Sequence, residues 1–312
     1  TTLENTRAKT PRNSLILLLT ATIWGMAFVS QSKGMDYMHP FTFNGVRSLI
    51  GAAGILLYIL ISRKIAGDKA AKLDWKLNVK AGLLCGIFLT IASTLQQFGI
   101  KYTSVGKAGF ITTLYIIFVP MFGIFLKKKV APVVWAAAGM AAVGMYLLCM
   151  TESLRLGAGD IMVFLCAIAF AIQIMTVDHY AARIDGAVVS CIQFTVCGVV
   201  CCIGALIWGQ PTFGQLQEGM GALLYAGVLS CGVGYTLQIV GQNGLNPTVA
   251  ALIMSLESVI ATISGWIAYK IGFLTTDQTL TARQIAGCVI VFAAVILVQL
   301  PPEWFRFGKK NA

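Results

Sequence analysis

Long apolar stretches alternate with short polar segments along almost the whole chain. Residues 14–31, 41–61, 131–150 and 284–300 are clear examples, and about ten such stretches follow one another. An α-helix rises about 1.5 Å per residue, so about 20 apolar residues cross the roughly 30 Å hydrocarbon core of a bilayer. A soluble domain can bury one such stretch but not about ten in succession. The pattern therefore predicts an integral membrane protein.

Helix-breaking residues divide the apolar stretches into ten predicted transmembrane helices, which gives an all-α fold. Proline and glycine mark the joints, for example at Pro40, Gly186 and Pro247. Gly82 and Gly86 have GxxxG spacing, which favours close approach of a neighbouring helix. The predicted helices span residues 14–33, 41–61, 79–100, 105–126, 131–150, 158–178, 187–208, 217–241, 247–269 and 283–300.

Composition supports a membrane location and argues against nucleic-acid binding. Only 11% of the residues are charged, whereas soluble proteins carry about 25%. The net charge is +11, but the basic residues lie at the ends of the apolar stretches. Most of them fall on one side of the bilayer if both termini lie on that side, and basic segments resist translocation. We therefore predict cytoplasmic tails at 1–13 and 301–312, and a lipid bilayer, not nucleic acid, as the surroundings.

The two halves of the chain, residues 14–150 and 158–300, can be aligned with one another. At a constant offset of 142 positions the alignment pairs Thr94 with Thr236, Gln96 with Gln238, and Tyr115 with Glu257. Each half has five predicted helices, an odd number, so the second half must enter the membrane in the opposite direction. Inverted repeats commonly place a solute site near the midplane and expose it to each side in turn.

Several motifs give the chain a family resemblance. These are Trp-Gly-Met-Ala-Phe at 24–28, Pro-Phe-Thr-Phe-Asn-Gly-Val-Arg at 40–47, Tyr-Thr-Ser at 102–104, Ser-Leu-Glu-Ser at 255–258, Phe-Leu-Lys-Lys-Lys-Val-Ala-Pro at 125–132 and Leu-Thr-Ala-Arg-Gln-Ile-Ala-Gly at 280–287. From about residue 14 to 300 the chain resembles the EamA-type drug/metabolite transporter superfamily. It departs from the usual pattern at Lys128 and Gln278, where many members have an acidic residue, and at Ser258, where proline is frequent.

The resemblance implies a ten-helix transporter of the bacterial inner membrane, often an exporter of amino acids, other metabolites or toxic compounds. It also implies that the fifth and tenth helices are peripheral, while the first, third, fourth, sixth, eighth and ninth surround a central cavity. A small-molecule solute is the expected partner, and a homodimer is left open.

Glu257 is the sharpest functional candidate, because it is the only carboxylate in the middle of an apolar stretch. An ionisable group at that depth is costly and usually faces a cavity or a partner. Such a carboxyl group can carry a proton, and in its ionised form it can bind a cationic amine. The alternative is a structural glutamate that ties helices together.

Aromatic and amide side chains at matched depths are further candidates for solute binding. Trp24, Phe28 and Gln31 share one helix face at i, i+4 and i+7. Such a face suits an amphipathic solute or an ammonium group, although helix packing also explains aromatic residues. Amides in lipid need hydrogen-bond partners, so they are less easily explained by packing. The remaining candidates are Gln96, Tyr115, Gln173, Tyr235 and Gln238.

Arg47 and Lys107 are interpreted as structural ion pairs or interfacial anchors. Long basic side chains near helix ends reach the interface easily. A rival function, an anion or nucleotide-sugar exchanger, would require both cations to face the cavity, and Glu257 argues against it.

The sequence offers little support for an enzyme, a metal site or a cofactor. The nine cysteines lack zinc-type spacing, and the two histidines, His39 and His179, fall at opposite membrane faces in this topology. The P-loop pattern is absent, so ATP is not the expected direct energy source. The predicted function is a secondary active transporter of a small organic solute, with export favoured over import; a passive channel is the remaining transport alternative.

Overall fold

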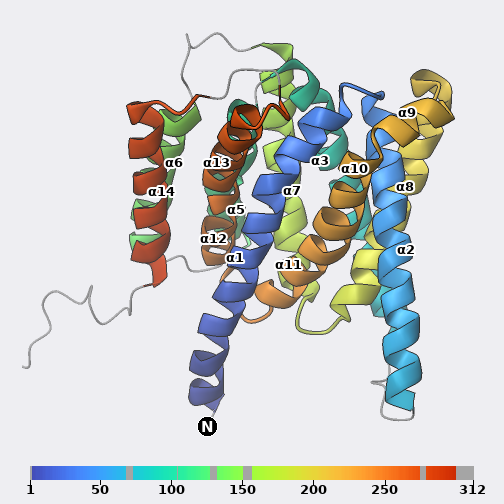
Figure 1. The fold of residues 1–312 in the computed structure, drawn as a ribbon. Coiled ribbons are helices and arrows are strands. Elements are labelled where there is room, and N and C mark those ends of the chain that lie inside the picture. Colours follow the sequence, from blue (N-terminus) through green and yellow to red (C-terminus); the bar gives the residue numbers. More distant parts are fainter. Residues whose placement is uncertain are drawn as a thin grey trace, which may run out of the picture.

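The computed structural model describes residues 2–67, 73–103, 105–126, 132–149, 157–274 and 279–299, which form helices and no strand (Figure 1). The first half contains α1 (Thr2–Gly34), α2 (Pro40–Ala66), α3 (Trp75–Tyr102), α4 (Val105–Thr113), α5 (Tyr115–Phe125) and α6 (Pro132–Cys149). The second half contains α7 (Ala158–Tyr180), α8 (Gly186–Gly204), η2 (Ala205–Gly209), α9 (Phe213–Glu218), α10 (Met220–Leu224), η3 (Tyr225–Gly234), α11 (Tyr235–Gln242), α12 (Pro247–Met254), α13 (Leu256–Lys270) and α14 (Ala282–Gln299).

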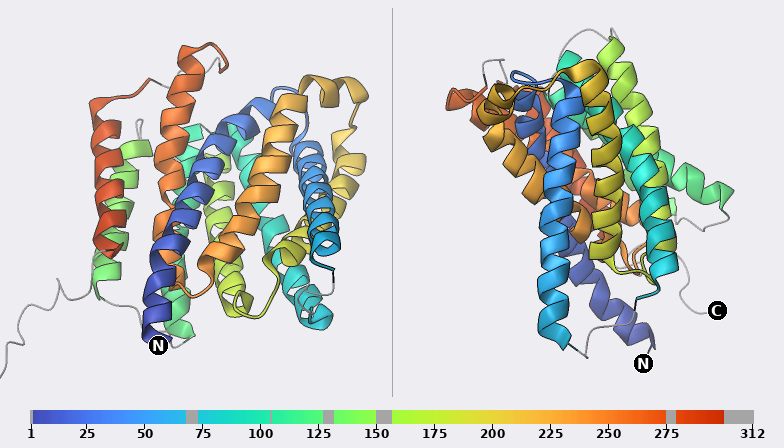
Figure 2. Two further views of the ribbon diagram at one scale, coloured as in Figure 1. Left: turned by 60° about the horizontal axis from the view of Figure 1, so that its bottom comes forward. Right: turned by 90° about the vertical axis from the view of Figure 1, so that its right-hand side faces the viewer.

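Eight helical segments in the described part are long and apolar enough to cross a membrane, so the chain is a multi-pass membrane protein. They correspond to every predicted span except the fifth and the tenth. At those two positions α6 and α14 are shorter apolar helices, and they stand together at one edge of the bundle (Figure 2). That these two also cross the membrane stays a prediction.

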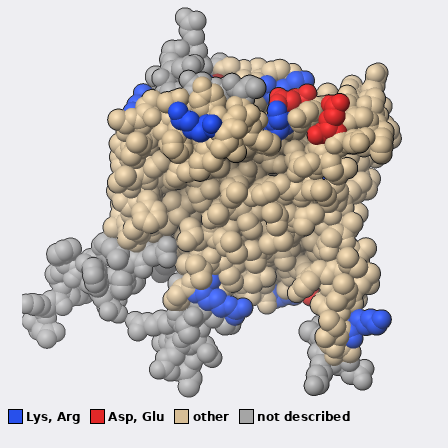
Figure 3. Space-filling model, in the orientation of Figure 1, with Lys and Arg blue, Asp and Glu red and all other residues tan. Residues whose placement is uncertain are grey.

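The surface has the character of a lipid-facing one. Charged side chains gather at the two ends of the molecule, with a wide band of uncharged residues between them (Figure 3). Large apolar side chains on the described helices point outward, such as Leu57, Ile87 and Leu206. In water such a band would favour association, whereas in a bilayer it meets the hydrocarbon core.

Local sequence signals explain where several helices begin. Asn246 accepts a hydrogen bond from the backbone N–H of Thr248, and Pro247 opens α12. His39 accepts from the backbone N–H of Phe41 through Nδ1, 3.3 Å away, at the start of α2. Burial, together with the nearby Lys101, lowers the pKa of His39, which keeps the ring in the neutral form that this acceptor role requires.

The two halves run in opposite directions and interlock. In Figure 1, α1 runs from the lower end of the bundle to the upper end, whereas α7 runs from the upper end to the lower. α3 packs against α7, and its counterpart α11 packs against α1. α14 ends at the same end of the bundle at which α1 begins. That this end faces the cytoplasm stays a prediction. Three features named in the sequence analysis lie outside the described residues: the tail 301–312, Lys128 and Gln278.

Four predicted helices contain irregularities that the sequence analysis missed. The fourth span is divided at Leu114 into α4 and α5, and the ninth at Ser255 into α12 and α13. Near each interruption a hydroxyl group donates to a helix carbonyl: Thr113 to that of Phe110, and Ser255 to that of Leu252. Such side-chain bonds compete with the regular backbone ladder. The seventh span ends in the π-helical turn η2, and the eighth contains the π-helical turn η3.

The GxxxG glycines bring α3 and α8 close together, as predicted. A Cβ atom added at Gly82 would lie 2.7 Å from Cβ of Ile192, and one added at Gly86 would lie 3.0 Å from Cβ of Val196. Neither position has room for a side chain unless α8 moves away.

Gly82→Leu is therefore expected to destabilise the bundle. Overpacking a close helix contact costs about 1–3 kcal/mol, so we expect a lower midpoint of thermal unfolding in detergent and a smaller monodisperse fraction. Gly54→Leu is the matched control, because a Cβ at Gly54 meets nothing within 4 Å. An equal fall of the unfolding midpoint in Gly82→Leu and Gly54→Leu would contradict the explanation that the close contact between α3 and α8 requires glycine.

Candidate functional site

A central cavity lies where the two halves meet. It has a volume of about 40 Å³ and is lined by side chains from both halves. Eight of the predicted binding residues line it: Trp24, Phe28, Gln31, Gln96, Tyr115, Tyr235, Gln238 and Glu257.

Glu257 lies at the centre of this cavity wall, in the first turn of α13. Only 4% of the residue is exposed, and Oε1 accepts a hydrogen bond from the hydroxyl group of Tyr115 over 2.9 Å. Tyr115 opens α5, directly after the interruption at Leu114. The two residues that the repeat alignment pairs thus touch each other at corresponding helix breaks.

Aromatic side chains form a second part of the wall. The rings of Trp24 and Tyr235 lie 4.6 Å apart, and those of Phe194 and Tyr235 lie 5.0 Å apart. The indole N–H of Trp24 donates to the backbone carbonyl of Ser230 over 3.4 Å. Ser230 lies in the π-helical turn η3, and π-turns are frequent at functional sites.

The amides divide into two groups. Gln96 lines the cavity and donates to the hydroxyl oxygen of Thr112 over 3.2 Å. Gln31 also lines it, and its Oε1 has no hydrogen-bond partner among the described residues. Gln173 is not part of the cavity wall: it is fully buried and exchanges hydrogen bonds of 3.2 and 3.4 Å with Gln238. Gln173 thus contacts a residue of the wall, and the prediction that it binds solute stays a prediction.

Arg47 lines the cavity as well. It is 5% exposed, its Nε donates to Oδ1 of Asn44 over 3.0 Å, and its guanidinium group lies over the ring of Phe43. The interpretation of Arg47 as half of a structural ion pair is not what the structure shows, since no carboxylate among the described residues pairs with it. Arg47 faces the centre of the bundle because of how α2 is rotated about its own axis. Helix packing sets that rotation, and the sequence does not reveal it.

Asn44 and Thr112 line the same cavity and were missed by the sequence analysis. A signal existed for Thr112, which is three positions before the candidate Tyr115. Asn44 precedes Arg47 by three positions and shares its helix face, but the sequence does not reveal which way that face points.

Lys107 lies outside the cavity wall, at the beginning of α4. Its Nζ pairs with Oδ2 of Asp160 over 2.5 Å. Asp160 also accepts from the hydroxyl group of Thr103 and from the backbone N–H of Gly157, each over 2.8 Å. This network joins the end of α3 to the beginnings of α4 and α7. An anion exchanger needs both Arg47 and Lys107 in the cavity, and that condition is not met here.

The described residues contain no group of three or more His, Cys, Asp or Glu side chains that could hold a metal ion. The eight cysteines with described side chains form no disulfide with one another. The chemistry of the cavity is therefore that of hydrogen bonding, charge and aromatic contact.

Comparison with known proteins identifies the same architecture. The model of the EamA-like transporter family matches the chain twice, over residues 12–150 and 157–300. These two copies fit the two repeats.

Curated relatives extend over nearly the whole chain. An uncharacterized transporter of Archaeoglobus fulgidus is 27% identical over 91% of this chain and 84% of its own length. The uncharacterized transporter YwfM of Bacillus subtilis is 24% identical over 93% of this chain and 94% of its own length. A solved crystal structure of a protein superimposes with a TM-score of 0.73 at 16% identity, covering 95% of this chain and 99% of that one. At that identity the likeness shows the fold alone.

Proposed function

Because the chain belongs to the EamA-like transporter family, we propose that it is a secondary active transporter of a small organic solute. The solute, an amino acid, an amine or a similar metabolite or toxic compound, crosses the bacterial inner membrane by alternating access, more readily outward than inward. The observation that carries the proposal is the cavity between two oppositely directed halves, in whose wall charged and amide side chains meet aromatic ones. Inverted repeats in transporters meet at such sites and expose them to each side in turn.

Glu257 is proposed as the coupling residue. It is the one carboxylate in the cavity wall, and it lies deep in a span. A proton and a cationic group of the solute would compete for the Glu257 carboxylate. A proton that binds Glu257 from the outside would therefore release the solute to the outside, and the proton would then enter the cell. The sequence lacks the P-loop that direct ATP coupling commonly uses.

The comparisons are consistent with a protein that is not an enzyme, because the family and the relatives are named as transporters. The cavity supports the same interpretation. It brings a single carboxylate together with amides and aromatic rings, whereas an acid–base enzyme site usually places two or more proton-transferring groups together.

The proposal is tested by ligand binding followed by exchange. Amino acids, polyamines, quaternary amines, nucleosides and sugar phosphates are screened for those that raise the unfolding temperature of the purified protein, since a ligand that binds only the folded state stabilises it. A compound that stabilises the protein should also show saturable counterflow in proteoliposomes. Absence of any stabilising compound, or passage without saturation, would contradict a carrier.

Two tryptophan variants locate the binding position. Trp24→Ala is expected to remove the stabilisation, because the ring lies in the cavity wall. Trp208→Ala is the matched control: its ring stacks on Phe41 and is 64% exposed, outside that wall. If the ligand raised the unfolding temperature of neither variant, the result would not support binding at Trp24 in the cavity.

A further inference from the structure

We propose that a groove on the lipid-facing side of the bundle binds one acyl chain of an anionic phospholipid, whose phosphate group is held by Lys33 and Lys270. The groove lies over α1, between α13 on one side and α10 with η3 on the other (Figure 1). It has a volume of about 610 Å³. No residue lines both this groove and the central cavity, so lipid binding here does not depend on which solute is transported.

The walls of the groove are hydrocarbon. α13 contributes isoleucine side chains at four positions, and α1 contributes Met26 and Val29. Three hydroxyl groups also lie in the wall, but each donates to a backbone carbonyl: Ser30 to that of Ala222 over 2.9 Å, Tyr225 to that of Ile23 over 3.1 Å, and Ser264 to that of Gly25 over 3.4 Å. Because these hydrogens are already engaged within the protein, the groove favours an apolar occupant.

The length of the groove matches one leaflet of a bilayer. Along α13 it extends from Ile260 to Ile271, eleven positions, which is about 16 Å at about 1.5 Å per residue. One leaflet contributes half of the roughly 30 Å hydrocarbon core, or about 15 Å. A transmembrane helix of a second protein chain would need a groove as long as the whole core. A single acyl chain that starts at one membrane surface fits this length.

Two lysines stand at the end of the groove where a headgroup would lie. Lys33 follows Met26 by seven positions, shares its face of α1, and lies in the last turn of that helix. Its Nζ is 5.9 Å from the centre of the ring of Phe273, which itself lines the groove. Lys270 lies in the last turn of α13, three positions after Ile267 of the groove wall.

Both ammonium groups can bind a phosphate. Lys33 pairs with Asp36 over 2.9 Å, but an ammonium group has three hydrogens to donate, and the side chain of Asp36 is 56% exposed. Lys270 is exposed and has no ion pair in the described part of the chain. Basic side chains at a membrane surface attract anionic lipid headgroups. Cations above and hydrocarbon below match the two parts of a phospholipid.

A bound chain would support α1 from the outside. The opposite side of α1 carries Trp24, Phe28 and Gln31 of the central cavity wall. Because a ligand that binds only the folded state stabilises it, the lipid should raise the unfolding temperature of the protein.

Lipid titration into the purified protein in detergent tests the inference. The probes are dioleoyl phosphatidylglycerol, dioleoyl phosphatidylcholine and glycerol 3-phosphate, which carries the phosphate without a chain. We expect phosphatidylglycerol to raise the unfolding temperature, and to appear as one bound molecule in native mass spectra, at concentrations about tenfold or more below those that phosphatidylcholine requires. Glycerol 3-phosphate should have no effect at these concentrations, because it leaves the groove empty.

Lysine variants test the headgroup. Lys33→Gln combined with Lys270→Gln should weaken binding of phosphatidylglycerol to about the level of phosphatidylcholine and leave phosphatidylcholine nearly unchanged. Lys101→Gln is the matched control, since Lys101 also lies in the last turn of a helix, α3, with its Nζ over an aromatic ring, but away from the groove. It should change neither affinity.

Groove variants test the acyl chain. Gly221→Trp should weaken both lipids about tenfold or more, because a Cβ at Gly221 meets nothing within 4 Å and the added ring takes space in the groove. Gly54→Trp is the matched control, with the same open surroundings outside the groove. If Gly221→Trp does not fold, Ile267→Trp takes its place, because Ile267 is 48% exposed in the groove wall.

Four outcomes would overturn the inference. Equal affinity for phosphatidylglycerol and phosphatidylcholine would leave the lysines without a headgroup to bind. Unchanged lipid binding in a folded groove variant would place the lipid elsewhere. Stabilisation by glycerol 3-phosphate equal to that by phosphatidylglycerol would indicate a phosphate site without an acyl chain. A dimer that Ile267→Trp dissociates, and Gly54→Trp does not, would show that a second copy of the chain occupies the groove.

Discussion

Glu257→Gln is expected to abolish transport driven by a proton gradient, with a loss of about tenfold or more. The substitution keeps the size of the side chain and its ability to accept from Tyr115, but removes the exchangeable proton and the negative charge. Because Glu257 is the one carboxylate in the cavity wall, no other lining group can replace it. The measurement is solute movement in proteoliposomes under an imposed pH difference, with a solute identified by counterflow.

Tyr115→Phe and Glu257→Asp are the matched variants. Tyr115→Phe removes a single hydrogen bond to Oε1 and keeps the carboxylate. It should slow transport less than Glu257→Gln and keep the response to the pH difference. Glu257→Asp should also keep that response. Glu257→Gln with the wild-type dependence on the pH difference would refute the coupling role.

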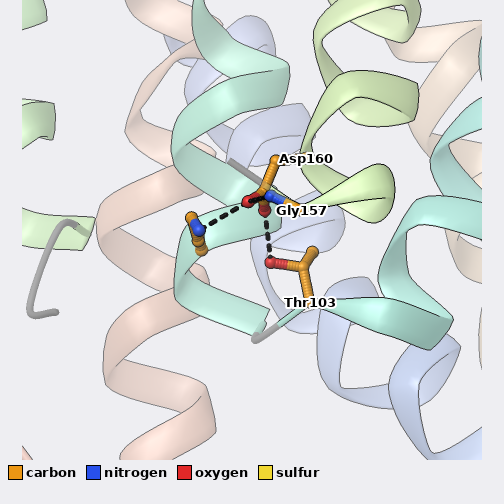
Figure 4. A network of polar contacts seen from close by, with 4 residues as sticks. Thr103, Gly157 and Asp160 are labelled. Atoms are coloured by element: carbon orange, nitrogen blue, oxygen red, sulfur yellow. Dashed lines mark hydrogen bonds and ion pairs between the residues drawn. The ribbon is translucent and has the colours of Figure 1, made fainter. Parts of the chain in front are cut away.

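Asp160→Asn is expected to destabilise the folded protein by about 1.5–3 kcal/mol, because hydrogen bonds to a charged group contribute about this much. Asp160 is 3% exposed and accepts from three groups at the ends of three helices (Figure 4). The neutral amide has one acceptor oxygen in place of two and no charge for Lys107. The measurement is the unfolding temperature in detergent.

The chain offers a matched control for this change. Asp36 pairs with Lys33 over 2.9 Å, but Asp36 is 56% exposed. Exposed pairs contribute about 1 kcal/mol or less. Asp36→Asn should therefore leave the unfolding temperature nearly unchanged, and equal shifts in the two variants would show that the Asp160 network has no special structural role.

The sequence predicted the positions of the helices well, because about 20 apolar residues between breakers leave few alternatives in a bilayer. It also indicated the meeting of Tyr115 and Glu257, since the repeat alignment places them at corresponding depths. Residues related by an axis through the centre of the bundle lie near each other when they lie near that axis.

Other features depended on three-dimensional packing and could not be predicted. The rotation of α2 decides that Arg47 faces the cavity, and no periodicity in an almost uniformly apolar helix reveals it. Gln173 and Gln238 come from different helices, so their mutual hydrogen bonds were not visible in either stretch. The partner of Lys107, Asp160, is 53 positions away in the sequence. The π-helical turn η3 has no reliable sequence signal.

The most direct test of the central cavity uses a cysteine that already lines it. Cys231 is retained as the only cysteine, and an impermeant thiol reagent is applied to membrane vesicles of either orientation. Lipid-facing Ile87→Cys in the cysteine-free protein is the control. If the cavity alternates between the two sides, Cys231 reacts from both, bound solute slows the reaction, and the control cysteine does not react. Reaction from one side only under every condition, or from neither, would contradict an alternating cavity.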